Sequence, residues 1–186
     1  MGLGAALLIA ALVLTAYNLW TDHKAAAKSG AMLPAVAGSR LTADDVPDWR
    51  LHPDMEMPEV EVDGQRYIGT LSIPAMDAEL PVISHWSEEA LRLAPCRYAG
   101  SAYAGGFVIA AHNYSAHFGR LKSLSEGDEV TFTDMDGNVF RYRVVLTEVL
   151  SAGAVEDMND DSWALTLFTC TWGGANRIAV RCEAVR

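Results

Sequence analysis

Three side chains with chemically useful groups stand at the ends of apolar, strand-like runs in this sequence. Cys170 ends the run 166–170, Arg177 opens the next run, and His112 directly follows the run 107–111. A thiolate is a strong nucleophile, an imidazole transfers protons, and a fixed guanidinium stabilises a developing oxyanion. Taken singly, a strand cysteine is usually a small buried hydrophobe. The occurrence of all three at strand ends favours nucleophilic chemistry at a cysteine.

The elements that must position these groups are mostly short strands. Apolar and β-branched runs bounded by turn residues predict strands over 67–73, 79–84, 107–111, 130–133, 139–144, 163–170 and 177–185. Asp136-Gly137 marks a hairpin, and the strand after it is expected to continue toward residue 150. Helix is limited to about 87–93 and a turn or two within 117–124. This pattern predicts an all-β domain with minor helices, about eight strands forming a closed barrel or a sandwich.

The acidic balance of the chain excludes one class of function. The 186 residues include 24 Asp and Glu against 14 Lys and Arg, a formal net charge of -10. Nucleic-acid phosphates require a basic surface. We therefore expect no nucleic-acid partner.

The N-terminus predicts a membrane anchor. Residues 2–20 carry no charge, and at about 1.5 Å per residue they span most of a hydrocarbon layer about 30 Å thick. Tyr17 and Trp20 stand where interfacial aromatic residues are expected. A cleaved signal peptide is the alternative, but no clear small-x-small cleavage site follows. Lys24 and Lys28 follow the span with no cation before it, so charge bias alone mildly favours the orientation opposite to export.

Residues 21–61 are expected to form a linker between the anchor (1–20) and a folded domain (62–186). The first part is rich in Ala, Gly and Ser, and the second part is acidic and carries three prolines. Trp49 is unusual for a linker, and either docks onto the domain or stays an exposed aromatic.

At these motifs the sequence resembles the sortases, the cysteine transpeptidases of Gram-positive cell surfaces. The matching motifs are Thr-Leu-x-Thr-Cys at 166–170, the strand opening with Arg177, Ala-His-Asn at 111–113 and Phe-x-x-Leu at 118–121, within a resemblance covering about residues 66–186. Ala111 stands where the family usually has glycine. Arg181 is a second arginine, but Arg177 aligns better with the family's position.

The resemblance implies a single closed eight-stranded barrel and a transpeptidation mechanism. Cys170 would attack the threonine carbonyl of an LPxTG-like sorting signal, His112 would protonate the leaving amine, and Arg177 would steady the oxyanion. Thr169, Asn113 and Ala111 would bind substrate. The resolving amine would belong to a cell-wall peptidoglycan precursor or a pilin lysine. No cofactor is needed.

The resemblance also implies location and substrates. The proteins acted on would be surface proteins or pilins that bear a sorting signal. The enzyme would be a single-pass protein of the cell membrane with its catalytic domain outside, an orientation held on these functional grounds.

Several finer points stay open at the level of sequence. The loop before the cysteine strand lacks the long helix typical of class B sortases, and we leave the class open between B-like and D-like. Its acidic residues, Glu156, Asp157, Asp160 and Asp161, loosely resemble the calcium loop of class A, although a solvated acidic loop is the favoured interpretation. Asp48-Trp49 is only faintly similar to a class C lid.

Cysteine counting leaves another alternative open. The three cysteines have no CxxC spacing, so a structural zinc site is not expected. If Cys170 is the reduced nucleophile, Cys96 and Cys182 are either a disulfide or two buried thiols.

Three other functions compete with transpeptidation. A cysteine protease would use the same groups with water as the acceptor. A non-enzymatic anchored β-domain would not need Cys170. A zinc site formed by His112, His117 and a cysteine has poor ligand spacing.

Overall fold

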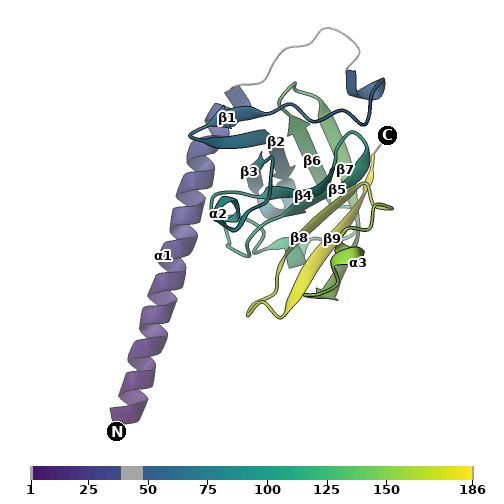
Figure 1. Ribbon diagram of the computed structural model, residues 1–186. Coiled ribbons are helices and arrows are strands. Elements are labelled where there is room, and N and C mark those ends of the chain that lie inside the picture. The colour runs from purple at the N-terminus through teal and green to yellow at the C-terminus, as the bar shows by residue number, and fades with distance from the viewer. Residues whose placement is uncertain (1, 39–47, 186) are drawn as a thin grey trace.

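The computed structural model describes residues 2–38 and 48–185, and within them the chain forms one long helix and nine strands (Figure 1). The elements are α1 (Gly2–Gly38), η1 (Asp48–Arg50), β1 (Val60–Val62), β2 (Gln65–Ile73), η2 (Pro74–Met76), β3 (Ala78–Ile83), α2 (Glu88–Leu91), β4 (Cys96–Ser101), β5 (Gly105–Ala110), η3 (Leu121–Ser123), β6 (Glu129–Asp134), β7 (Val139–Ser151), α3 (Val155–Met158), β8 (Leu165–Cys170) and β9 (Asn176–Ala184).

Eight of these strands close into a barrel. The sheet runs β2-β3-β4-β5-β8-β9-β7-β6, and β6 pairs back onto β2 from Gly69–Asp134 to Ser72–Thr131. The short β1 is a ninth strand that pairs with the beginning of β2. Gly69 allows the closure, because a Cβ there would lie 2.2 Å from the carbonyl oxygen of Thr133. The prediction of an all-β, eight-stranded closed barrel after an N-terminal helix is confirmed.

The barrel is packed on both faces of its central strands. Its interior holds a continuous cluster that includes Phe107, Phe118, Phe132 and Leu167, with the rings of Phe107 and Phe132 5.0 Å apart. A second buried cluster lies on the opposite face of the sheet and includes Val108 and Phe168. Strands buried on both faces read as continuous apolar runs, which explains the sequence of β5 and β8.

Helix α1 differs from the expected division into anchor and linker. It is 37 residues long and continues without a break through residues 21–38, which the sequence assigned to the linker. Ala25, Ser29 and Val36 are buried on one side of it, where it packs along β1, β2 and β3. This spacing places all three on one helical face, so docking onto the barrel stabilises a segment whose composition alone suggested a flexible chain. The linker prediction over 39–47 lies outside the described residues.

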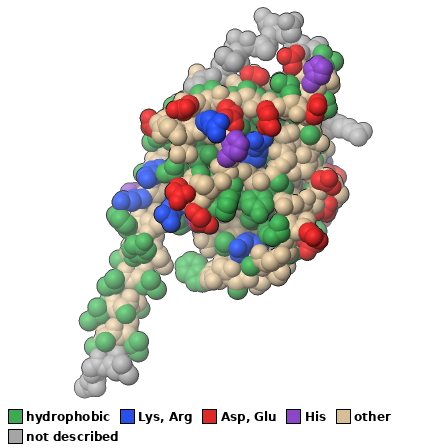
Figure 2. All heavy atoms as spheres, viewed as in Figure 1, with side chains coloured by type: hydrophobic (Ala, Val, Ile, Leu, Met, Phe, Trp, Pro, Cys, Tyr) green, Lys and Arg blue, Asp and Glu red, His purple; other side chains and the backbone are tan. Residues whose placement is uncertain are grey.

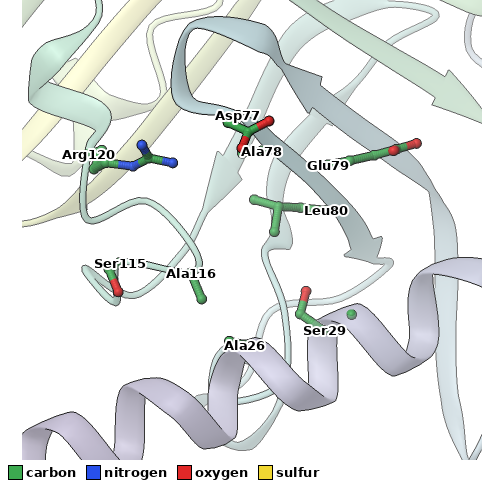
Figure 3. Close-up of a pocket in the computed structure, with 10 residues that line it drawn as sticks. Ala26, Ser29, Asp77, Ala78, Glu79, Leu80, Ser115, Ala116 and Arg120 are labelled. Carbon is green, nitrogen blue, oxygen red and sulfur yellow. The ribbon is translucent and has the colours of Figure 1, made fainter.

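The N-terminal part of α1 projects away from the barrel (Figure 1), and Tyr17 to Leu19 are its first residues to line a groove together with the barrel. Its large apolar side chains, from Leu7 to Trp20, are more than half exposed on all sides (Figure 2). The helix is long and apolar enough to cross a membrane. Where α1 meets the barrel, Ala26 and Ser29 face Leu80 and Arg120 across a small cavity of about 220 Å³ (Figure 3).

Two alternatives left open by the sequence are resolved by the fold. Trp49 docks onto the barrel, its ring 5.6 Å from Tyr103 and 5.0 Å from Phe140. Cys96 and Cys182 are both buried free thiols. They lie on β4 and β9, which β5 and β8 separate, so their backbones are on the order of 14 Å apart along the sheet, too far for a disulfide.

Candidate active site

The parallel pairing of β5 and β8 brings His112 and Cys170 to one edge of the barrel. Ala110 is in register with Phe168, and the Ala111 amide donates to the Phe168 carbonyl over 3.1 Å. The Thr169 hydroxyl then donates to the Ala111 carbonyl over 2.8 Å. Because parallel strands end at the same edge, the two residues that follow these contacts emerge side by side.

Arg177 reaches the same edge through the β8–β9 hairpin. It is the register partner of Cys170, and the loop between them is closed by the Thr171 amide donating to the Asn176 carbonyl over 2.9 Å. Gly173 and Gly174, at φ +84° and +76°, supply the left-handed backbone that this tight turn requires.

The Arg177 guanidinium is hydrogen-bonded within its own loop in this structure. Its Nη1 donates to the carbonyls of Gly174 and Asn176 over 3.0 and 3.1 Å. Arg177 is not among the described residues that line the active-site groove.

His112 and Cys170 both line a groove of about 1190 Å³. Two of the three predicted substrate-binding residues, Asn113 and Thr169, also line it, although Thr169 is only 2% exposed and its hydroxyl is used within the fold. Ala111 is buried beneath the groove, where its carbonyl ties β5 to β8.

Partial burial changes the acidity of His112. Removal from water lowers the pKa of His112 below its ordinary 6.5, Glu88 opposes that shift and Arg92 adds to it. The imidazolium is therefore a stronger acid than a free histidine, which suits proton donation to a leaving amine. The neighbouring ring of Tyr114 lies 5.0 Å away, centroid to centroid.

The loop after His112 is held by its own backbone. The Phe118 amide donates to the His112 carbonyl over 3.1 Å, and the Gly119 amide donates to the Tyr114 carbonyl over 2.8 Å. Phe118 and Leu121 are both fully buried in the barrel interior. The Phe-x-x-Leu motif therefore anchors the loop that carries the histidine.

This fold and this edge can be compared with known proteins. The family model described as the sortase domain matches residues 71–185. The chain belongs to the sortase family. Sortase A of Bacillus anthracis is 31% identical over 127 residues, which cover 63% of this chain and 59% of that protein. The match thus spans less than two thirds of that curated relative.

Solved sortase structures share the fold. A sortase D5 transpeptidase from Clostridium perfringens superposes with a TM-score of 0.64 at 18% identity, covering 86% of this chain and 99% of that one. Sortase A from Corynebacterium diphtheriae gives 0.61 at 18% identity, covering 95% of each chain. Sortase C1 from Streptococcus agalactiae gives 0.57 at 26% identity, covering 68% and 70%. Sortases named A, C and D are thus similarly close in fold, and the class stays open.

Arg181, the second arginine of β9, is buried and bound by polar groups of the fold. Arg181 is 2% exposed, and its Nε lies 2.7 Å from Glu148 Oε1. It also donates to the Thr166 hydroxyl over 3.1 Å and to the Met158 carbonyl over 3.5 Å. Arg181 therefore ties α3 to the barrel at a point opposite Thr166, four residues before the cysteine.

The acidic loop around α3 does not gather ligands. Asp160 caps the backbone amide of Ser162 over 3.0 Å. Among residues 2–38 and 48–185, no group of three or more His, Cys, Asp or Glu side chains could hold a metal ion. Within the same residues, His112, His117 and a cysteine do not form such a group.

The sequence missed the residues that α1 brings to the site. Asp22 accepts hydrogen bonds from the amide and the hydroxyl of Ser115, the amide contact being 2.7 Å. This contact joins residues 93 positions apart. A tertiary pairing of that kind leaves no local pattern. Trp172, which also lines the groove two residues after the cysteine, could have been noticed from its position.

Proposed function

We propose that this chain is a membrane-anchored cysteine transpeptidase that cleaves an LPxTG-like sorting signal and transfers the acyl part to an amine. The observation that carries the proposal is the shared groove edge, where the ends of β5 and β8 present His112 and Cys170 together. Arg177 stands across the β8–β9 ladder from the thiol.

The reaction has two acyl transfers. The Cys170 thiolate attacks the threonine carbonyl of the signal and forms a C–S bond, while the protonated His112 gives its proton to the departing amine as the C–N bond breaks. An incoming amine then attacks the thioacyl carbon, loses its proton to His112 and releases the thiolate. In each step Arg177 balances the negative charge of the tetrahedral oxygen.

The substrates follow from this chemistry and from family membership. The acyl donor would be a surface protein or pilin with a sorting signal, and the acceptor would be a cell-wall peptidoglycan precursor or a pilin lysine. Helix α1 would cross the cell membrane once and hold the barrel on its outer side, where such donors emerge. No bound cofactor takes part in either acyl transfer.

The choice of acceptor separates this proposal from a hydrolase. The full chain in detergent would be given a sorting-signal peptide with increasing triglycine, and the products would be weighed by mass spectrometry. We expect a peptide–triglycine adduct that rises with triglycine at the expense of hydrolysis. Hydrolysis alone at saturating amine would assign the chain to the cysteine proteases, and unchanged cleavage by Cys170→Ala would remove the catalytic assignment altogether.

A further inference from the structure

One large aromatic side chain at the active-site edge is used neither by the fold nor by the proposed chemistry. Trp172, in the loop between Cys170 and Arg177, is 87% exposed, against 45% for Trp86 on the loop after β3. Tryptophan side chains are enriched at protein interfaces and at membrane interfaces, so an exposed Trp172 at the rim of a groove is a candidate contact for a partner.

The apolar half of α1 fixes where a bilayer would end. Residues 2–20 rise about 28 Å as a helix, close to the thickness of the hydrocarbon layer. At the end of this span the rings of Tyr17 and Trp20 lie 6.2 Å apart, and the Lys24 ammonium sits 3.7 Å over the Trp20 ring. Such aromatic and cationic groups are typical of the membrane–water interface.

The same turn of α1 is part of the active-site groove. Tyr17, Leu19 and Asp22 line it together with Cys170 and Trp172. The residues of α1 expected at the membrane–water interface and the β8–β9 loop therefore lie on the same side of the molecule. In Figure 1 that loop points toward the end where α1 leaves the barrel.

Contacts between α1 and the barrel restrict rotation of the barrel relative to the helix. Asp22 accepts two hydrogen bonds from Ser115, and the buried face of α1 continues along β1 to β3 through Ala25, Ser29 and Val36. The anchor and the barrel are joined through an uninterrupted helix. A bilayer around residues 2–20 therefore meets the edge of the barrel that carries the groove.

The charges at this edge suit a lipid surface. Arg92, Arg120 and Lys122 line the groove, in a chain whose net charge is -10. The acids that line it are Asp22, which is bound to Ser115, and Glu88. Figure 2 shows several Lys and Arg side chains where the apolar part of α1 ends, with Asp and Glu side chains next to them. Cations at this height are attracted to anionic headgroups.

We propose that the active-site edge of the barrel rests on the membrane surface, with Trp172 in the interfacial layer as a second lipid contact beside α1. The groove then opens among the headgroups, and both acyl donor and amine reach Cys170 along the bilayer rather than from bulk water. The partner is an anionic lipid surface. The proposal stands on α1 and Trp172, and it does not depend on the transpeptidase activity.

The test measures the surroundings of Trp172 in the full chain, which has five tryptophans. Wild type, Trp172→Phe and Trp86→Phe would be reconstituted into bilayers of phosphatidylcholine and phosphatidylglycerol. Some of the lipids would be brominated high on the acyl chain. The fluorescence of Trp172 is the difference between wild type and Trp172→Phe, and circular dichroism would check that each variant folds.

We expect the Trp172 difference spectrum to be blue-shifted, quenched at least twofold by brominated lipid and shielded from aqueous acrylamide. The Trp86 difference spectrum serves as the matched exposed control and should respond chiefly to acrylamide. The proposal would be overturned if brominated lipid does not quench the Trp172 fluorescence and acrylamide quenches it as strongly as it quenches free tryptophan. Neither result involves catalysis, so the proposed function is tested separately.

Discussion

At the scale of single residues, the two arginines of β9 differ in what surrounds them. Arg177 binds carbonyls of its own loop at the groove edge, whereas Arg181 is buried and paired with Glu148. The alignment with the sortase pattern favoured Arg177 for chemistry, and the burial of Arg181 gives an independent reason to place its role in stability.

Substitution should separate these roles. Arg177→Ala, like His112→Ala, is expected to lower kcat/KM by on the order of 10² or more, because oxyanion support or proton transfer is lost. Arg181→Ala should instead lower the free energy of unfolding by about 3 kcal/mol, since Glu148 loses its buried partner. Kinetics and chemical denaturation of the three variants would check this. A larger loss of kcat/KM at Arg181 with unchanged stability would reverse the assignment.

His117 is a titratable residue that the mechanism does not use. It is fully buried, and neither ring nitrogen has a hydrogen-bond partner within the described residues. Burial lowers its pKa to about 4, His112 adds to the shift and Asp22 opposes it. The folded protein therefore holds this imidazole neutral.

The lowered pKa of His117 predicts acid sensitivity. Below pH 6.5 the unfolded chain binds a proton that the folded chain does not, so stability is complete above pH 6.5 and falls as the pH drops toward 4. The loss attributable to His117 approaches about 3 kcal/mol. Denaturant unfolding between pH 7 and 4 should show a shallower dependence for His117→Phe than for the wild type, with the exposed His52→Phe as control. Identical slopes in all three proteins would refute it.

At the scale of elements, the barrel was predictable and the course of α1 was not. Alternating or continuous apolar runs, the Asp136-Gly137 turn and the motif around Cys170 are local signals, and seven strands formed where they indicated. The barrel strand β4 and the short β1 were not predicted, and β4 has no continuous apolar or β-branched run that would mark it. The segment 21–38 looked like a linker because its Ala, Gly and Ser content is ambiguous. Its helix depends on burying Ala25 and Val36 against distant strands, a contact that no local pattern encodes.

Two Gly→Ala substitutions should move stability in opposite directions. In α1 a Cβ on Gly30 would meet nothing within 4 Å, so Gly30→Ala gains helix propensity of about 1 kcal/mol. In the histidine loop a Cβ on Gly119 would lie 2.7 Å from the Tyr114 carbonyl oxygen, so Gly119→Ala must push the loop apart. Thermal unfolding should show a raised Tm for the first and a lowered Tm for the second. Equal shifts of the same sign would contradict the described packing of these two elements.

At the scale of the whole molecule, the strand ends that carry the candidate site residues were easier to predict than the groove around them. Cys170, His112 and Arg177 were proposed from strand ends, and the topology brings those strand ends to one edge through one parallel and one antiparallel pairing. The wall of the groove formed by Tyr17, Asp22 and their neighbours could not be predicted, because it requires the placement of α1 against the barrel. That placement is also the basis of the proposed contact between the groove edge and the membrane.

The central claim is that Cys170 carries the acyl group between donor and amine. Its most direct test is intact-mass analysis of the full chain, quenched with acid after brief incubation with a sorting-signal peptide. We predict an increase equal to the acyl fragment, located on Cys170 by peptide mapping, absent in Cys170→Ala and discharged when an amine is added. Cleavage of the peptide without such an adduct in wild type, or undiminished cleavage by Cys170→Ala, would contradict the account.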